Sequence, residues 1–283
     1  MKICIAGGSG FIGKNLVYFL KDLGHEIALI SHKQLSSNNA AESIRNSEIV
    51  INLMGESIAG RWTMAKRGRI MESRMKATQT LMKVVKMHGS MVRNIIGVSA
   101  VGVYDSVHTH TEESLNYSEG FLKEVVINWE SAYLNAGIHN ARICIMRLGV
   151  VLGNNGGMLL KLEKILPRFV GIIIKGQRNF TFVHIADLLS SVDFVIKNEF
   201  IEGIVNVTSP YFISIESFYK LWASVRKVVV RLYVFKWVMK IALGEAAELL
   251  FDGQRVIPEK LLKAGFVFSF ENPESALLHL RAK

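Results

Sequence analysis

A glycine-rich turn close to the start of the chain constrains the fold more than any other feature. The residues GGSGFIG at positions 7–13 directly follow a short apolar run, Ile3–Ala6. They open a segment, Phe11–Leu23, in which apolar residues recur at helical spacing. A strand, a glycine-rich turn and a helix in direct succession are typical of a βαβ unit that binds a dinucleotide.

The glycines of this turn have separate roles in such a unit. Gly7 permits the tight turn, Gly10 lets the backbone approach a pyrophosphate, and Gly13 allows the helix to pack closely on the strand. The N–H groups and the dipole at the helix start then favour negative charge. We therefore expect a nicotinamide dinucleotide here; the alternative is a turn that only connects strand and helix. The expected cofactor contacts are Gly7, Ser9, Gly10, Phe11, Ile12 and Gly13.

Strands and helices alternate along the first half of the chain. Further strands are predicted at Glu26–Ile30, Glu48–Leu53, Asn94–Ser99 and Ala141–Arg147, with helices at Ser73–Met87 and Phe121–Asn135. This rhythm predicts an α/β fold with a Rossmann-type doubly wound parallel sheet. We expect a dinucleotide-binding domain over residues 1–153 and a smaller C-terminal substrate lobe over 154–283, with a strand near 204–208 joining the main sheet.

Two segments depart from a simple pattern. Residues 34–47 are too few for the third strand and helix that usually follow at this point. The apolar segment Val228–Leu243 is interrupted by basic residues, so it predicts either a strand followed by a helix or an amphipathic surface segment. Core packing is the commoner explanation of such an apolar stripe, and membrane contact is the rarer one.

The residues after the second predicted strand bear on the choice between NAD and NADP. Proteins that select NAD usually place a carboxylate there, which binds the ribose hydroxyls. This chain has Ser31, His32 and Lys33 instead, whose donors suit a 2′-phosphate. We therefore expect NADP(H) with these three residues among its ligands; a solvated loop is the alternative.

The composition narrows the class of partner. The formal net charge is +10, but Lys and Arg are scattered and no nucleic-acid motif accompanies them. We therefore expect phosphate-bearing small molecules rather than nucleic acid. No uncharged apolar run is long enough to span a membrane.

Three smaller features bear on the cellular compartment and on metal binding. The N-terminus leads directly into a strand without a signal-peptide cleavage pattern, which favours the cytoplasm. Cys4 and Cys144 lie in runs that are predicted to be buried strands, where packing is their simplest role. The histidines lack metal-ligand spacing, so no metal site is expected.

Motifs spread along nearly the whole chain resemble the extended short-chain dehydrogenase/reductases, in particular an atypical, sugar-nucleotide-epimerase-like branch of the NAD(P)-dependent epimerase/dehydratase family. They are INLMGE at 51–56, AGRW at 59–62, SAVGVYD at 99–105, WE at 129–130, RLGVVLG at 147–153 and GQRV at 253–256. The resemblance implies the extended Rossmann fold, bound NADP(H) and a substrate pocket between two lobes. It also adds Leu53, Gly55 and Arg147 to the expected cofactor contacts.

The resemblance weakens at the catalytic positions. Typical members use Ser, Tyr and Lys, and the Lys lowers the pKa of the Tyr so that the phenol can exchange a proton. Here the Tyr and Lys positions hold Leu122 and Val126, and the Asn position holds Arg74. Ser99 fills the serine position, with Ala100 as the alternative. The usual catalytic group is therefore absent or reduced to one member.

Four residues remain as catalytic candidates, namely Ser99, Tyr104, Glu56 and His184. Tyr104 and Glu56 follow predicted strands at the carboxyl edge, where α/β folds bind ligands, so they could act as acid and base. His184 titrates near neutrality and could donate a proton. The alternatives are a packing role for Tyr104, a loop ion pair for Glu56 and a structural role for His184. Arg74, if buried, needs an anionic partner such as Glu56 or a cofactor phosphate.

These features support two functions. The first is an NADP(H)-dependent epimerase or oxidoreductase that acts on a small substrate, possibly linked to a nucleotide. The second is a non-catalytic protein that binds and senses NADP(H). A retained substrate lobe favours the enzyme, whereas the missing Tyr-Lys pair favours the sensor. The expected partners are a small-molecule substrate and, as one alternative, a second copy in a homodimer.

Overall fold

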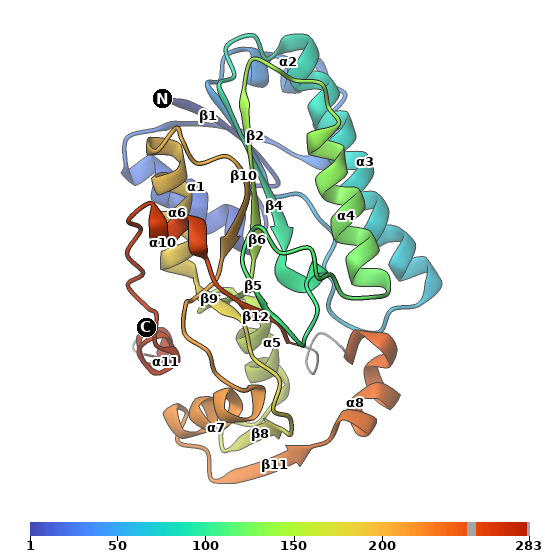
Figure 1. Cartoon of the computed structure of the whole chain (residues 1–283), viewed down its shortest axis with the longest axis vertical. Helices are drawn as coiled ribbons and strands as arrows, with labels where there is room; N and C mark the ends of the chain where they lie inside the picture. Colours follow the sequence, from blue (N-terminus) through green and yellow to red (C-terminus); the bar gives the residue numbers. More distant parts are fainter. Residues whose placement is uncertain (248–252, 282–283) are drawn as a thin grey trace.

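A six-stranded parallel sheet forms the centre of the computed structural model, which describes residues 1–247 and 253–281 (Figure 1). In the order β10-β6-β4-β3-β1-β2, the strands are Gly203–Val207, Arg142–Leu148, Asn94–Ala100, Ile49–Asn52, Lys2–Ala6 and Glu26–Ile30. The strand order reverses between β1 and β3, and a doubly wound sheet binds its ligand at the carboxyl ends beside such a reversal. The predicted Rossmann-type α/β fold is confirmed.

Helices cover both faces of this sheet (Figure 1). One face carries α1 (Phe11–Asp22) and α6 (Ile185–Lys197), and the other carries α2 (Asn38–Arg45), α3 (Met64–His88) and α4 (Phe121–Leu134). Because both faces are covered, the strands are mostly apolar on both sides rather than alternating between apolar and polar residues. Cys4 and Cys144 are buried in β1 and β6, and burial raises the pKa of both thiols to about 12. Both therefore stay protonated packing residues at neutral pH.

One segment agrees with the prediction and one boundary differs from it. Residues 34–47 contain the short helix α2 but no strand, so they do not hold both elements, as predicted, and the sheet ends at β2. Helix α3 begins at Met64, nine residues before the predicted start at Ser73, because the side chain of Thr63 accepts a hydrogen bond from the backbone N–H of Lys66. The first turns of α3 are largely polar, so apolar periodicity did not reveal them.

A second group of elements lies below the sheet in Figure 1. It contains α5 (Gly157–Ile165), α7 (Ile215–Val225), α8 (Lys236–Leu243), α11 (Pro273–Arg281) and the two-stranded parallel sheet of β8 (Val170–Ile174) and β11 (Val230–Val234). These elements enclose their own apolar core, centred on Phe180, Phe182 and Phe218. The chain nevertheless returns to the first core through β10, α10 (Glu259–Lys263) and Phe266.

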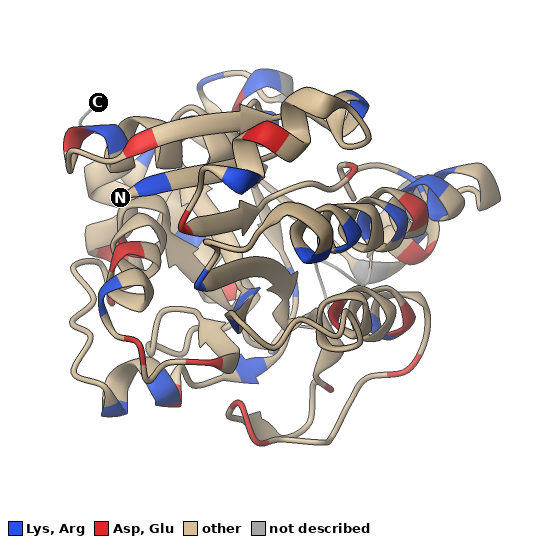
Figure 2. Ribbon diagram, turned by 90° about the horizontal axis from the view of Figure 1, so that it is seen from above, with Lys and Arg blue, Asp and Glu red and all other residues tan. Residues whose placement is uncertain are grey.

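Short strands connect the two cores. Strand β7 (Val150–Gly153) pairs with β9 (Phe182–His184), and β5 (Thr109–His110) pairs with β12 (Arg255–Val256). Segments from both sides of residue 153, where the predicted dinucleotide-binding domain ends, therefore share hydrogen bonds. Figure 2 shows Lys and Arg distributed over many elements rather than gathered on one.

Val228–Leu243 forms a strand followed by a helix, which was one of the two predicted alternatives. Core packing does not explain its apolar residues, however. The side chains of Val229, Trp237 and Ile241 are 82%, 66% and 69% exposed.

Gly97 provides a test of the packing between β4 and α4. A methyl group at this position would lie 2.4 Å from Cζ of the fully buried Tyr133. We expect Gly97→Ala to lower the free energy of unfolding by about 1–3 kcal/mol, as overpacking does. Gly68 of α3 has open space around it, so Gly68→Ala should raise this free energy by about 0.5–1 kcal/mol. Urea denaturation measures both, and equal effects of the two substitutions would contradict the packing described.

Candidate functional site

The glycine turn meets the end of β3 in close backbone contact. Gly7 has φ +87°, and a Cβ there would lie 2.9 Å from the carbonyl carbon of Leu53. A Cβ on Gly13 would lie 2.6 Å from the carbonyl oxygen of Gly7. Both positions therefore require glycine, the first for its left-handed conformation and both for space.

The amino end of α1 is open to an anion. Its N-cap, Gly10, has no side chain that could accept from the first helical N–H groups. These groups have no partner within the helix, so an external acceptor such as a pyrophosphate suits them. Phe11 packs against the loop after β7, where a Cβ on Gly156 would lie 2.3 Å from Cδ2 of the ring. Ser9 and Ile12 belong to the same turn and first helical residues.

A cavity of about 380 Å³ lies beside the carboxyl end of β2. His32 lines it from the residues after β2, Glu56 from those after β3, and Arg69 and Lys76 from α3. The two acidic residues of its wall are each paired with a lysine, Glu56 with Lys66 at 2.7 Å and Glu72 with Lys76 at 2.6 Å. Ser31 is the N-cap of the short helix His32–Gln34, and its hydroxyl lies 2.8 Å from Oε1 of Gln34. Ser31, His32 and Lys33 are all exposed.

A buried ion pair lies at the ends of β4 and β6. Arg147 donates from Nε and Nη2 to the two carboxylate oxygens of Glu130 at 2.8 and 2.7 Å. Ser99 donates its hydroxyl proton to the same carboxylate at 2.7 Å. Although burial opposes the charged form, these bonds and the charge of Glu130 raise the pKa of Arg147. Ser99, at the serine position of the family, is therefore hydrogen-bonded within the protein. Contact between Arg147 and a cofactor stays a prediction.

Tyr104 lies beside this pair and is completely buried. Its hydroxyl donates to Oδ1 of Asn206 at 3.1 Å, its ring stacks on His110, and the guanidinium carbon of Arg147 lies 4.9 Å from the ring centre. Burial is the main reason that the pKa of the phenol is raised. A buried phenol with a raised pKa favours the packing role over the acid role that the sequence also allowed.

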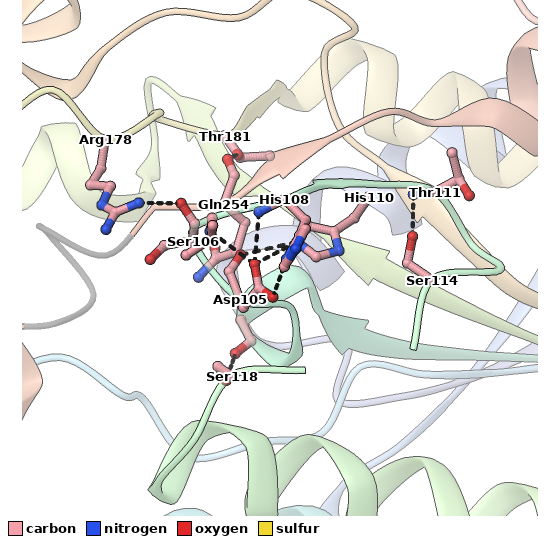
Figure 3. Close-up of polar contacts among 12 residues, drawn as sticks. Asp105, Ser106, His108, His110, Thr111, Ser114, Ser118, Arg178, Thr181 and Gln254 are labelled. Atoms are coloured by element: carbon pink, nitrogen blue, oxygen red, sulfur yellow. Dashed lines mark hydrogen bonds and ion pairs between the residues drawn. The ribbon is translucent and has the colours of Figure 1, made fainter. Parts of the chain in front are cut away.

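The loop after Tyr104 is held by a polar cluster that reaches the second half of the chain (Figure 3). Asp105 accepts from the backbone N–H of His108 at 2.9 Å, and its other carboxylate oxygen lies 2.7 Å from Nδ1 of that residue. His110 Nε2 lies 3.1 Å from the backbone oxygen of Asp105. Arg178 donates to the backbone oxygen of Ser106. These contacts anchor the loop that carries Tyr104.

Glu56 and Arg74 form a separate group after β3. A hydrogen bond from Lys66, together with its charge, lowers the pKa of Glu56, so this carboxylate stays ionised at neutral pH. Arg74 Nη1 donates to the backbone oxygen of Glu56 at 3.0 Å rather than to its carboxylate. An anionic partner was expected only if Arg74 is buried, and this condition is not met: the side chain is half-buried, binds a carbonyl and lies over Trp129, with the charge of Glu56 nearby. Burial lowers the pKa of Arg74 to about 10.

His184 belongs to neither group and is buried at the start of α6. Its Nδ1 accepts from the backbone N–H of Ala186 at 3.1 Å, and its Nε2 lies 3.2 Å from Nδ1 of His279 in α11. Asp187 accepts from the backbone N–H groups of Ser269 and Phe270. His184 thus caps the helix, and the geometry favours its structural role. Ser99 and Tyr104 meet through Arg147, whereas Glu56 and His184 have their partners elsewhere.

Several residues of these groups were not predicted as site residues. Glu130, Asn206 and Lys76 are the main examples, and only the first had a visible signal, an acid on the apolar face of a predicted helix. Within residues 1–247 and 253–281 there is no group of three or more His, Cys, Asp or Glu suited to a metal ion. The helices described in those ranges also include none that is long and apolar enough to cross a bilayer.

An open helix terminus, a glycine turn at the point of strand reversal and an adjoining cavity lined by charged side chains define a dinucleotide-binding protein of the Rossmann type. The chain belongs to the NAD-dependent epimerase/dehydratase family, whose model matches residues 3–210. It is an NAD(P)-binding member of the atypical, sugar-nucleotide-epimerase-like branch. A domain of unknown function (DUF1731) matches residues 234–280.

Known proteins resemble the chain over its whole length. The epimerase family protein YfhF of Bacillus subtilis is 31% identical over 301 residues, covering 100% of this chain and 98% of that protein. The crystal structure of human epimerase family protein SDR39U1 (isoform 2) with NADPH has 25% identity and a TM-score of 0.91, and the match covers 100% of both chains. UDP-glucuronic acid 4-epimerase of Bacillus cereus in complex with NAD shares the fold, with 14% identity and a TM-score of 0.75 over 98% of this chain and 96% of that one.

The Glu130–Arg147 pair supplies a stability prediction. Glu130→Gln removes the charge that compensates a buried guanidinium, so we expect the free energy of unfolding to fall by about 3–5 kcal/mol. Glu124→Gln is the matched control, because it makes the same change at an exposed position of the same helix. Its effect should stay below about 1 kcal/mol. Denaturant unfolding at neutral pH measures both; a loss in Glu130→Gln no larger than in the control would refute the role of the pair.

Proposed function

We propose that this chain binds NADP(H) in preference to NAD(H) and uses it as an epimerase- or oxidoreductase-like enzyme on a small anionic substrate. The observation that carries the cofactor preference is that no carboxylate directly follows β2, where it would accept from the ribose hydroxyls of NAD. His32, Arg69 and Lys76 line the adjoining cavity as donors for a 2′-phosphate, and its two carboxylates, Glu56 and Glu72, are each paired with a lysine. The human SDR39U1 structure, which contains NADPH, supports the same preference.

Basic side chains also support an anionic substrate such as a nucleotide sugar. Lys161 of α5 lies 3.4 Å from the hydroxyl of Ser57, in the loop after β3, and Lys66 pairs with Glu56 in the same loop. These ammonium groups reach the loop after β3 from two helices, α3 and α5. A diphosphate-linked substrate would find complementary charge there. Within this proposal Glu56 orients the lysine, and Ser99 and Tyr104 hold the wall of the site.

The cofactor preference can be tested by placing a carboxylate after β2. We expect His32→Asp to weaken NADPH binding by at least about tenfold, because the new charge repels the 2′-phosphate, and to strengthen NADH binding. Ser90→Asp is the matched control, since it adds one negative charge at an exposed site after α3. Titration followed by cofactor fluorescence gives both dissociation constants. If the wild-type protein binds NADH as tightly as NADPH, or neither cofactor, the proposal fails.

A second function, sensing of NADP(H) without turnover, is favoured by one specific observation. Tyr104 is completely buried and Ser99 is bonded to Glu130, so neither presents a free proton-transfer group in this structure. The family positions for Tyr and Lys hold Leu122 and Val126, which cannot exchange protons.

Turnover distinguishes the two functions. The enzyme predicts one of two results: loss of NADPH absorbance with at least one carbonyl compound of a panel, or conversion of a nucleotide sugar to its epimer, which leaves the cofactor unchanged overall and is followed by chromatography of the sugar. The sensor predicts tight binding with neither change across the panel. Turnover that survives in a Ser99→Ala variant would show that hydride transfer proceeds without the one remaining member of the usual catalytic group.

A further inference from the structure

Strand β11 and helix α8 expose an apolar surface that neither core uses. Its exposed side chains, which we call the β11–α8 surface, are Val229, Val230, Leu232, Tyr233, Phe235, Trp237, Val238 and Ile241. Phe169, itself 58% exposed, adjoins them, because its backbone oxygen accepts from the N–H groups of Val229 and Val230. Figure 1 shows β11 along the outer edge of the lower group of elements, with α8 rising from its end at the lower right of the view. Exposed apolar surface of this extent is unusual on a monomer and indicates a binding partner.

The segment that carries this surface contains charges of one sign only. Residues 227–241 read KVVVRLYVFKWVMKI, with four basic residues and no Asp or Glu. The side chains of Lys227, Arg231 and Lys240 are exposed beside the apolar ones. Exposed aromatic and aliphatic side chains interleaved with cations are the pattern of a segment that lies in the interface of an anionic bilayer.

We propose that the β11–α8 surface docks the protein on an anionic lipid membrane. Trp237, Phe235 and Tyr233 enter the headgroup region, the aliphatic side chains reach the acyl boundary, and the cations bind lipid phosphates. Docking is peripheral, in keeping with the described helices, none of which could span a bilayer. The site is separate from the cavity beside β2, so docking does not depend on the cofactor.

Two other occupants fit the surface less well. In a symmetric pairing of two β11 edges, the cations of one copy would face those of the other, and like charges across strands are destabilising. Single-stranded nucleic acid binds through aromatic stacking and phosphate contacts, and would leave the aliphatic side chains Val229, Leu232, Val238 and Ile241 without a partner. The anionic bilayer satisfies the charge and the apolar area together.

Trp237 provides a readout confined to this surface. Of the four tryptophans it alone is exposed, while Trp62, Trp129 and Trp222 are buried. We expect vesicles of phosphatidylcholine with phosphatidylglycerol to shift the emission of the wild-type protein to shorter wavelength and to carry the protein upward in flotation. Vesicles of phosphatidylcholine alone should bind much less. Binding should also weaken at about 1 M salt, where the Debye length is only about 3 Å.

Charge-reversed variants localise the contact. Arg231→Glu with Lys240→Glu should weaken partition onto the anionic vesicles by at least about tenfold, because two attractive charges become repulsive. Lys21→Glu with Lys83→Glu is the matched control, since it changes the net charge equally at exposed positions of α1 and α3. It should bind vesicles nearly as the wild type does. Unchanged NADPH affinity and unfolding midpoint in both double variants show that the fold is intact.

The proposal is overturned if the wild-type protein stays free of anionic vesicles, or if both double variants lose binding equally. It is also overturned if light scattering shows a wild-type dimer that Ile241→Ser with Leu232→Ser converts to monomers, because a second copy then covers the surface. The surface would be assigned to nucleic acid instead if the protein bound an oligothymidylate more tightly than anionic vesicles at the same salt concentration, and if only the Arg231→Glu, Lys240→Glu variant lost that binding.

Discussion

The buried carboxylate of Glu130 organises the region where this fold places its chemistry. It accepts two hydrogen bonds from Arg147 of β6 and one from Ser99 of β4, so a single side chain of α4 holds the ends of two neighbouring strands. The guanidinium in turn lies against the ring of Tyr104. A buried charge pair of this kind is costly to break but adds little net stability, which makes a positioning role its best explanation. The arrangement occupies space that a proton-transfer group would otherwise share with the substrate.

The features that the sequence predicted correctly depend on local rules. The turn at 7–13 can be recognised in the sequence because only glycine fits two of its positions. Gly7 has a left-handed φ, and Gly13 lies too close to the turn for a Cβ. The parallel sheet was predictable because strands covered on both faces are mostly apolar. The Glu130–Arg147 pair and the cavity wall shared by His32 and Arg69 join residues of different elements. Composition and periodicity carry no signal for such pairings, so these contacts required the structure.

Exposure is the other property that periodicity does not determine. The stripe over Val228–Leu243 has the same apolar content as a core segment, and Ile215–Val225, which has a similar pattern, does pack in the second core. The difference is tertiary: β11 has β8 on one edge, and the described residues place no further strand on the other. Interspersed Arg231 and Lys240 were the local sign that this segment meets solvent or a charged surface rather than a core.

The region around the six-stranded sheet and the β11–α8 surface are therefore constrained in different ways. Around the six-stranded sheet, close backbone contacts and buried polar pairs leave little freedom, which suits a rigid dinucleotide whose hydride must be held at a fixed distance from its acceptor. Hydride transfer needs position above all, but reduction of a carbonyl and epimerisation at a carbon that bears a hydroxyl both also need a group that exchanges the hydroxyl proton. Tyr104 and Ser99 are turned inward in this structure. A reaction on this site would thus draw its proton from the substrate, from solvent or from a lysine beside the loop after β3, such as Lys66 or Lys161.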